Sequence, residues 1–177
     1  GGKSVDTTMG LTPLEGITMG TRSGNIDPAI VEFIANKENK TITEIMNILN
    51  KESGVYGLSG KSSDFRDLNK GIAEGDERCD IAMNVFCYQA AKFIGGYVAA
   101  MNGVDAIAFT AGVGENDHLV RELICNRLEY LGIKMDKEAN KTRGEEARLS
   151  TEDSKIPVYI VPTNEELAIA RETVALV

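Results

Sequence analysis

Residues 106–116 have the types and spacing best suited to holding a phosphate group. An apolar run containing Ile107 and Phe109 ends in Gly112-Val113-Gly114-Glu115-Asn116, and an amphipathic helical pattern follows directly. Glycine lets the backbone approach a ligand closely, and a helix N-terminus presents unpaired N–H groups with partial positive charge. The pattern therefore predicts a phosphate- or nucleotide-binding loop, although glycines between a strand and a helix are often only turn residues.

A second apolar run, residues 157–162, leads into a second polar turn, Thr163-Asn164-Glu165-Glu166, which opens a helical pattern. In open α/β sheets, ligands bind beyond the carboxyl ends of the strands, so we expect both turns to face one crevice. Glu165 or Glu166 would hold a hydrated Mg²⁺ there. Alternatively, the two glutamates are first-turn acids that favour the helix dipole.

Two further turns supply candidate cations. Arg22 lies between glycines in Gly20-Thr21-Arg22-Ser23-Gly24. Its guanidinium offers a rigid fork of donors that suits a phosphoryl group or a carboxylate, although a loop arginine is more often a solvated residue. Ser62-Ser63-Asp64-Phe65-Arg66 leads into a helical pattern. Asp64 and Arg66 either line the same crevice or serve only as a helix N-cap and a surface charge.

The elements that must position these residues alternate between strands and helices. Helical patterns are expected over residues 28–36, 42–49, 64–72, 77–101 and 119–131 and from 165 onward, and residues 52–63 are rich in glycine and serine. Thr41 and Glu44 have the spacing of a capping box. The 77–101 pattern is apolar over a wide arc, which predicts burial, and is expected to break at Gly95-Gly96. Apolar strands between helices indicate an α/β fold with parallel pairing, in one domain over residues 1–177.

Composition limits the classes of partner. The 177 residues are 42% hydrophobic and 26% charged, with a formal net charge of −8, which argues against nucleic acid or an anionic membrane as partner. No run is long and apolar enough to span a membrane, and the first residues do not resemble a signal peptide. Cys79, Cys87 and Cys125 lack metal-ligand spacing, and their odd number favours a reducing cytoplasm. The single histidine, His118, argues against a zinc site.

Five segments, taken together, closely resemble acetate kinases. In the family's order they are TTMGLTPLEG (7–16), MGTRSG with IDP (19–24, 26–28), SSDFR (62–66), FTAGVGEN (109–116) and PTNEELAIA (162–170). Five long motifs in register are far more specific than any one of them. Propionate kinases are similar enough that the acyl group stays open.

The resemblance implies the C-terminal half of an actin-like, sugar-kinase-like (ribonuclease H-like) α/β fold, with the first strands of the sheet missing. It implies reversible phosphoryl transfer between ATP and acetate, giving acetyl phosphate and ADP, with Mg²⁺ as cofactor. By match to the family's motifs, Arg22 is the catalytic arginine and Glu165 the metal-associated carboxylate. The nucleotide-binding residues implied are Asp64, Phe65, Arg66, Gly112, Val113, Gly114, Glu115 and Asn116.

The family's N-terminal half, which carries further catalytic residues, has no counterpart in these motifs. We therefore expect the chain to be inactive alone. The resemblance also implies a family of cytoplasmic homodimers. A non-catalytic nucleotide-binding module is the alternative from another class of protein. The unaltered Arg22 in its motif speaks against that alternative, because a binding module has less need of a cation facing the phosphoryl group.

Overall fold

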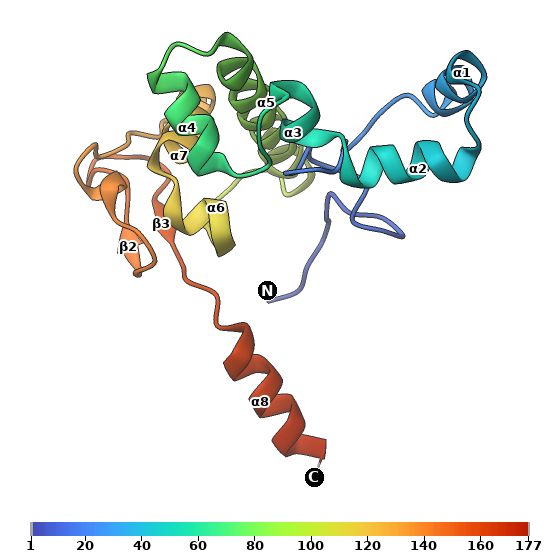
Figure 1. Ribbon diagram of the computed structural model, residues 1–177. Coiled ribbons are helices and arrows are strands. Elements are labelled where there is room, and N and C mark those ends of the chain that lie inside the picture. Colours follow the sequence, from blue (N-terminus) through green and yellow to red (C-terminus); the bar gives the residue numbers. More distant parts are fainter. Residues whose placement is uncertain (1, 177) are drawn as a thin grey trace. The chain divides into compact units, whose positions relative to one another are not determined.

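The computed structural model describes residues 2–176 and divides the chain into two compact units. Unit 1 is Gly1–Gly103 and unit 2 is Val104–Val177. Within the described residues, unit 1 consists of helices and loops, and every strand belongs to unit 2 (Figure 1). That the chain forms one domain stays a prediction. No helix in the described part of the chain combines the length and the apolar character that crossing a membrane requires.

Unit 1 contains a pair of helices and a group of three. Helices α1 (Ala29–Glu38) and α2 (Ile42–Lys51) pack around Ala35, Ile45 and Leu49. Helices α3 (Gly54–Ser59) and α4 (Phe65–Ala73) pack on the long α5 (Glu77–Ala100). The predicted capping box is confirmed, because the Thr41 hydroxyl accepts from the Glu44 amide while the Glu44 carboxylate accepts from the Thr41 amide.

Unit 1 departs from the sequence patterns in two places. Residues 54–59, within the Gly- and Ser-rich stretch, form α3, whose first amides find carbonyl partners far away in the sequence. Helix α5 continues through Gly95-Gly96, because a glycine weakens a helix without ending it. The expected burial of α5 holds only on one side of its first two thirds. Its Cys79 and Cys87 are buried, whereas Tyr88 is 55% exposed.

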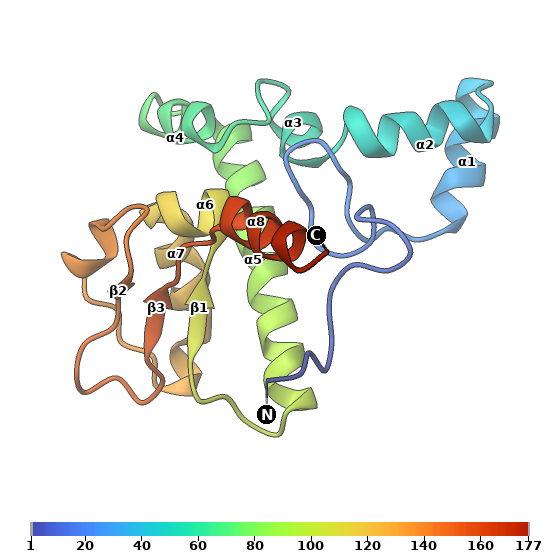
Figure 2. The same cartoon turned by 90° about the horizontal axis from the view of Figure 1, so that it is seen from below.

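The sheet of unit 2 has three short strands, β1 (Ile107–Phe109), β2 (Ala147–Arg148) and β3 (Val158–Ile160), in the order β1-β3-β2 (Figure 2). Strands β1 and β3 pair in parallel, with Ile107 opposite Val158 and Phe109 opposite Ile160, as the sequence predicted. The short β2 pairs antiparallel to β3. The α/β fold class is therefore confirmed, with a small, partial sheet.

Helices follow both parallel strands. After β1 come α6 (Ala111–Asn116) and α7 (His118–Cys125), then the 3-10 helices η1 (Asn126–Leu131) and η2 (Ala139–Lys141); α8 (Glu165–Leu176) follows β3. The glycine stretch expected as a loop is thus itself a short helix, and the helix expected over 119–131 changes to 3-10 geometry after Cys125. Helices were expected to start near residues 119 and 165, and α7 and α8 start at His118 and Glu165.

Only one face of the sheet is buried in unit 2. Ile107, Phe109, Val158 and Ile160 point into the core with Leu128, whereas Ala108 on the opposite face is exposed. Within the described residues, the second face has no cover over Ala108.

Two helical glycines should respond oppositely to alanine. A Cβ on Gly71 in α4 would lie 2.5 Å from the Cys79 Sγ of α5, so Gly71→Ala should force the helices apart and cost about 1–3 kcal/mol. A Cβ on Gly96 in α5 would meet no described atom within 4 Å, so Gly96→Ala should stabilise by about 0.5–1 kcal/mol. Urea unfolding of both variants measures the difference. Equal effects would contradict the close approach of α4 and α5.

Candidate functional site

One carboxylate oxygen joins the two strand-end turns of unit 2. The Glu115 Oε1 accepts hydrogen bonds from the Ala111 amide at 2.6 Å, from the Thr163 amide at 2.8 Å and from the Thr163 hydroxyl at 3.1 Å. Since β1 and β3 are parallel neighbours, their carboxyl ends share one edge of the sheet. The two turns therefore lie together, and Glu115 fastens them. The Thr163 amide, above all, lowers the pKa of the Glu115 carboxyl.

In the glycine stretch, some side chains fix the course of the main chain, and at Gly112 the space beside the main chain is open. The side chains of Glu115 and Asn116 hold it, the latter by donating to the Gly112 carbonyl at 2.9 Å. Ala111 has a φ of +56°, a conformation that disfavours any residue with a Cβ. A Cβ on Gly112 would meet no described atom within 4 Å, so the fold itself does not require glycine there.

A fully buried arginine, Arg121, donates a hydrogen bond to the main chain of α6. The Arg121 guanidinium of α7 donates to the Gly114 carbonyl at 2.9 Å, to the Thr142 carbonyl at 2.8 Å and to both oxygens of Asn140. Burial lowers the pKa of this guanidinium, and main-chain oxygens compensate for the lost water. Sequence reasoning missed Arg121 and Asn140, because nothing local distinguishes an arginine whose side-chain partner Asn140 lies 19 residues away.

Glu165 is the first residue of α8 and is exposed. Asn164 directly precedes this helix, and its side-chain oxygen accepts from the Leu167 amide at 2.9 Å. No group of three or more His, Cys, Asp or Glu side chains in the described residues is arranged to hold a metal ion. A single carboxylate suits Mg²⁺, which keeps several waters and takes its other ligands from substrate phosphates.

In unit 1, the start of α3 holds the turn that carries Arg22. Three carbonyls of the turn accept from amides at the start of α3, each at 2.9 Å: Met19 from Val55, Gly20 from Tyr56, and Thr21 from Ser53. Gly54 must be glycine, because its φ is +64° and a Cβ would lie 2.3 Å from the Met19 carbonyl oxygen.

The Arg22 side chain itself has little to bind. Its guanidinium meets only the Met19 sulfur at 3.7 Å, and it belongs to no ion pair among the described residues. The main chain around Arg22 is thus fixed while its cation stays available to an anion.

The segment 64–66 opens α4. Asp64 is the N-cap, accepting from the Arg66 amide at 2.8 Å, so that interpretation is confirmed. The Arg66 side chain pairs with the same carboxylate and lowers the pKa of Asp64 to about 2. The Phe65 side chain is buried and meets Phe86 edge-on, with ring centroids 4.7 Å apart. A nucleotide role for this segment stays a prediction, and Phe65 would contribute to it through its main chain.

The Arg22 turn and the segment leading to Asp64 lie side by side. A Cβ on Gly20 would be 3.2 Å from the Ser63 carbonyl oxygen and 3.3 Å from the Ser63 Cβ. Two of the stretches singled out in the sequence are therefore neighbours in unit 1, and the other two are neighbours in unit 2.

Comparison with known proteins identifies the family. The sequence model of the acetokinase family matches residues 1–171. The chain belongs to the acetokinase family. Acetate kinase from Agathobacter rectalis is 66% identical over 177 residues, and that from Carboxydothermus hydrogenoformans is 60% identical over 176. These matches cover 99% of this acetokinase chain but only 45% and 44% of the two relatives, so the chain spans about half their length.

Solved acetokinase structures agree with the fold. Porphyromonas gingivalis acetate kinase superposes with a TM-score of 0.93 at 44% identity, covering 98% of this chain and 44% of that one. A propionate kinase from Francisella tularensis gives a TM-score of 0.90 at 42% identity, covering 97% and 44%. The expectation of a partial acetate-kinase fold is confirmed.

The Glu115 bridge should give unit 2 an acid-sensitive component of stability. Because the folded-state pKa lies below the ordinary value of 4.5, this component is present above 4.5 and is lost as the pH falls through the folded-state pKa. Glu115→Gln should lower the melting temperature near neutral pH, and the gap to the unaltered chain should close in that acid range. Melting curves across the range test this, with the exposed Glu166→Gln as matched control. A gap that does not change with pH would contradict the role of the charge.

Proposed function

We propose that the chain is the nucleotide-binding part of an enzyme that transfers a phosphoryl group reversibly between ATP and acetate, giving acetyl phosphate and ADP. The observation that carries the proposal is the Glu115 bridge. It keeps the glycine-bearing α6 and the turn before Glu165 at one edge of the sheet. Main-chain amides of α6 and the Glu165 carboxylate thus lie at the same edge of the sheet, where amides can bind the phosphates and a carboxylate the metal of a metal-nucleotide.

Each predicted residue has a part in this reaction. Phosphoryl transfer depends mainly on positioning and on neutralising charge at the transferred group. Arg22, whose guanidinium is in no ion pair among the described residues, neutralises that group and orients it. The main chain of residues 112–116 binds the nucleotide phosphates, and residues 64–66 contact the adenosine side. Glu165 would hold Mg²⁺, which when bound neutralises charge on the phosphate oxygens.

Two alternatives remain in view. Propionate as the acceptor is supported by the likeness to the Francisella propionate kinase, whose TM-score of 0.90 is close to that of the acetate kinase structure. A non-catalytic nucleotide-binding module is disfavoured by Arg22, because a cation kept free of carboxylates suits a phosphoryl group. By resemblance to the family, the assembled enzyme is a cytoplasmic homodimer.

A graft tests the proposal directly. The chain replaces the matching 45% of the Agathobacter acetate kinase, to which it is 66% identical. The graft should form acetyl phosphate from ATP, acetate and Mg²⁺, whereas the 177-residue chain alone should form none, because transition-state positioning needs the rest of the enzyme. A folded graft without turnover would contradict the proposal. The ratio of kcat/KM for acetate and propionate decides the acyl group.

Arg22 should matter for rate rather than for nucleotide binding. In the graft, Arg22→Ala should lower kcat on the order of 10³-fold or more, with the KM for ATP little changed, because a charge at the transferring group acts mainly in the transition state. Arg22→Lys should recover part of the rate, since the charge remains and the fork is lost. Arg171→Ala, an exposed arginine of α8, is the control. A large rise in KM with unchanged kcat would favour the binding-module alternative.

A substitution at Gly112 should affect nucleotide binding much more than folding stability. Because a Cβ there meets open space and Gly112 has no positive φ, Gly112→Leu should change stability by less than about 1 kcal/mol. The same side chain should obstruct close approach of phosphates and weaken nucleotide binding to the graft at least about tenfold, or ~1.4 kcal/mol. Calorimetric titration with Mg-ADP measures this effect. Unchanged affinity would remove residues 112–116 from the nucleotide site.

A further inference from the structure

The loop between α3 and α4, residues 60–63, has no apolar anchor of its own. Gly60, Lys61 and Ser63 are exposed, and Ser62 is half-buried. Polar contacts must therefore fix its course. The buried Ser59 hydroxyl accepts from the Lys61 amide at 3.2 Å and from the Ser62 amide at 3.4 Å. These bonds hold the start of the loop, and the Lys61 side chain holds it from the other side.

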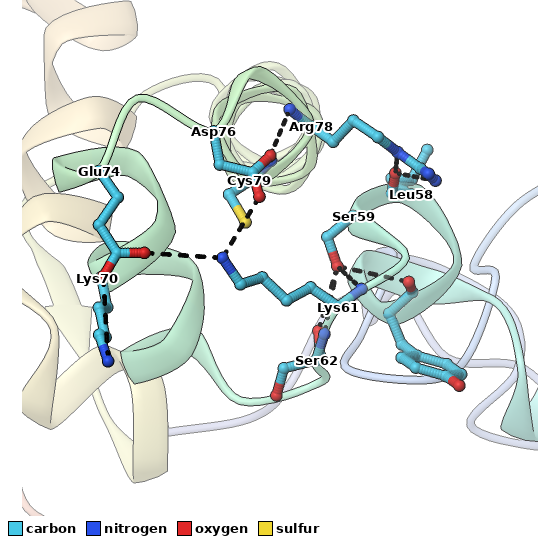
Figure 3. Close-up of polar contacts among 10 residues, drawn as sticks. Leu58, Ser59, Lys61, Ser62, Lys70, Glu74, Asp76, Arg78 and Cys79 are labelled. Carbon is cyan, nitrogen blue, oxygen red and sulfur yellow. Dashed lines mark hydrogen bonds and ion pairs between the residues drawn. The ribbon is translucent and has the colours of Figure 1, made fainter.

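The Lys61 side chain reaches across to the start of α5 (Figure 3). Its ammonium lies 3.3 Å from the Asp76 Oδ2 and 3.9 Å from the Glu74 carboxylate. A Cβ on Gly71 would come within 3.2 Å of the same nitrogen, so the glycine leaves the space that the ammonium occupies. We call this group, Lys61 with Gly71, Glu74 and Asp76, the Lys61 clamp.

The Asp76 carboxylate, which accepts from Lys61 in the clamp, is held in place by contacts that do not involve Lys61. Asp76 is the N-cap of α5, and its Oδ1 accepts from the Arg78 amide at 3.0 Å and from the Cys79 amide at 3.2 Å. Its Oδ2 is thereby aimed at Lys61. Most surface ion pairs contribute little because two flexible side chains must be ordered together. Here only the lysine is ordered, so the link is stiffer than its exposure suggests.

A second contact ties the same parts together. The Arg78 guanidinium donates to the Leu58 carbonyl at the end of α3, with Nη2 at 3.0 Å and Nε at 3.2 Å (Figure 3). Arg78 also lies against Gly60, whose Cβ would be 2.9 Å from Nη1. The first turn of α5 thus holds both the end of α3 and the loop after it.

The held loop connects the two candidate site segments of unit 1. The start of α3 holds the Arg22 turn, and Ser63 lies against Gly20 of that turn. Ser62 Oγ accepts from the Asp64 amide at 3.0 Å and donates to Asp67 at 2.7 Å, which fixes the first turn of α4. Any shift of residues 60–63 therefore moves Asp64 relative to Arg22.

From this geometry we infer that Lys61 and Asp76 are positioning residues, which set the place of the 64–66 segment against the Arg22 turn without touching a ligand. The inference deepens the proposed function and rests on it for one step only, that residues 64–66 contact the nucleotide. The mechanical step, from the clamp to the loop, is independent of any ligand.

Hydrogen exchange of the 177-residue chain tests the mechanical step. Lys61→Met should raise exchange about threefold in peptides covering residues 60–68, since losing a surface pair shifts local opening by a small factor. Asp76→Asn should do the same, because asparagine keeps the N-cap but not the charge. Lys61→Arg should restore protection. Lys70→Met removes the other lysine near Glu74, at 3.9 Å, and is the matched control with no effect on this loop. Unchanged exchange in Lys61→Met would overturn the clamp, whatever the graft does.

The same variants in the graft test the nucleotide step. Lys61→Met should raise the KM for ATP about threefold, with kcat within twofold and the KM for acetate unchanged; Lys61→Arg should recover the value. A purely structural loss would instead lower the amount of active enzyme without changing KM. Raised exchange with an unchanged KM for ATP would overturn the nucleotide step. Failure of the unaltered graft to turn over would count against the proposed function, and exchange would still decide the clamp.

Discussion

Main-chain groups that lack partners in their own turns constrain both units. A buried carbonyl or amide without a hydrogen bond is costly, so each turn that leaves such groups must find donors or acceptors elsewhere. In unit 1 the first amides of α3 meet the carbonyls of the Arg22 turn. In unit 2 the Arg121 guanidinium meets the carbonyls of Gly114, Asn140 and Thr142. The positions of the candidate site residues follow from these bonds.

This pattern explains what the sequence could and could not reveal. Caps such as Thr41 and Asp64 were predictable, because both partners lie within three residues. Parallel pairing of β1 and β3 followed from two apolar runs separated by helices. Helix α3, the bond from Thr163 to Glu115 across 48 residues and the Arg121–Asn140 contact were not predictable. Each depends on a partner far along the chain, and one sequence alone does not indicate which distant groups will meet.

The side chains with a predicted binding role fall into two groups, those engaged in contacts within the chain and those with few such contacts. Glu115, Asn116, Asp64 and Phe65 are engaged within the chain, through a triple acceptor, a carbonyl contact, an N-cap and an aromatic pair. Arg22 is half-buried and contacts the Met19 sulfur, and Glu165 is exposed. A motif in this acetokinase chain therefore mixes residues that shape the main chain with a few whose side chains have little contact within the chain.

The exposure of α8 has a consequence for how a metal would be captured. None of its twelve residues is buried, and a helix of that length is only marginally stable without packing. Glu165 stands in its first turn, where one side-chain cap from Asn164 keeps the helix in place. Binding of a cation by the Glu165 carboxylate would then be coupled to formation of α8, and the loss of conformational entropy would be shared by the two processes. The affinity for the ion would report how far α8 is already formed.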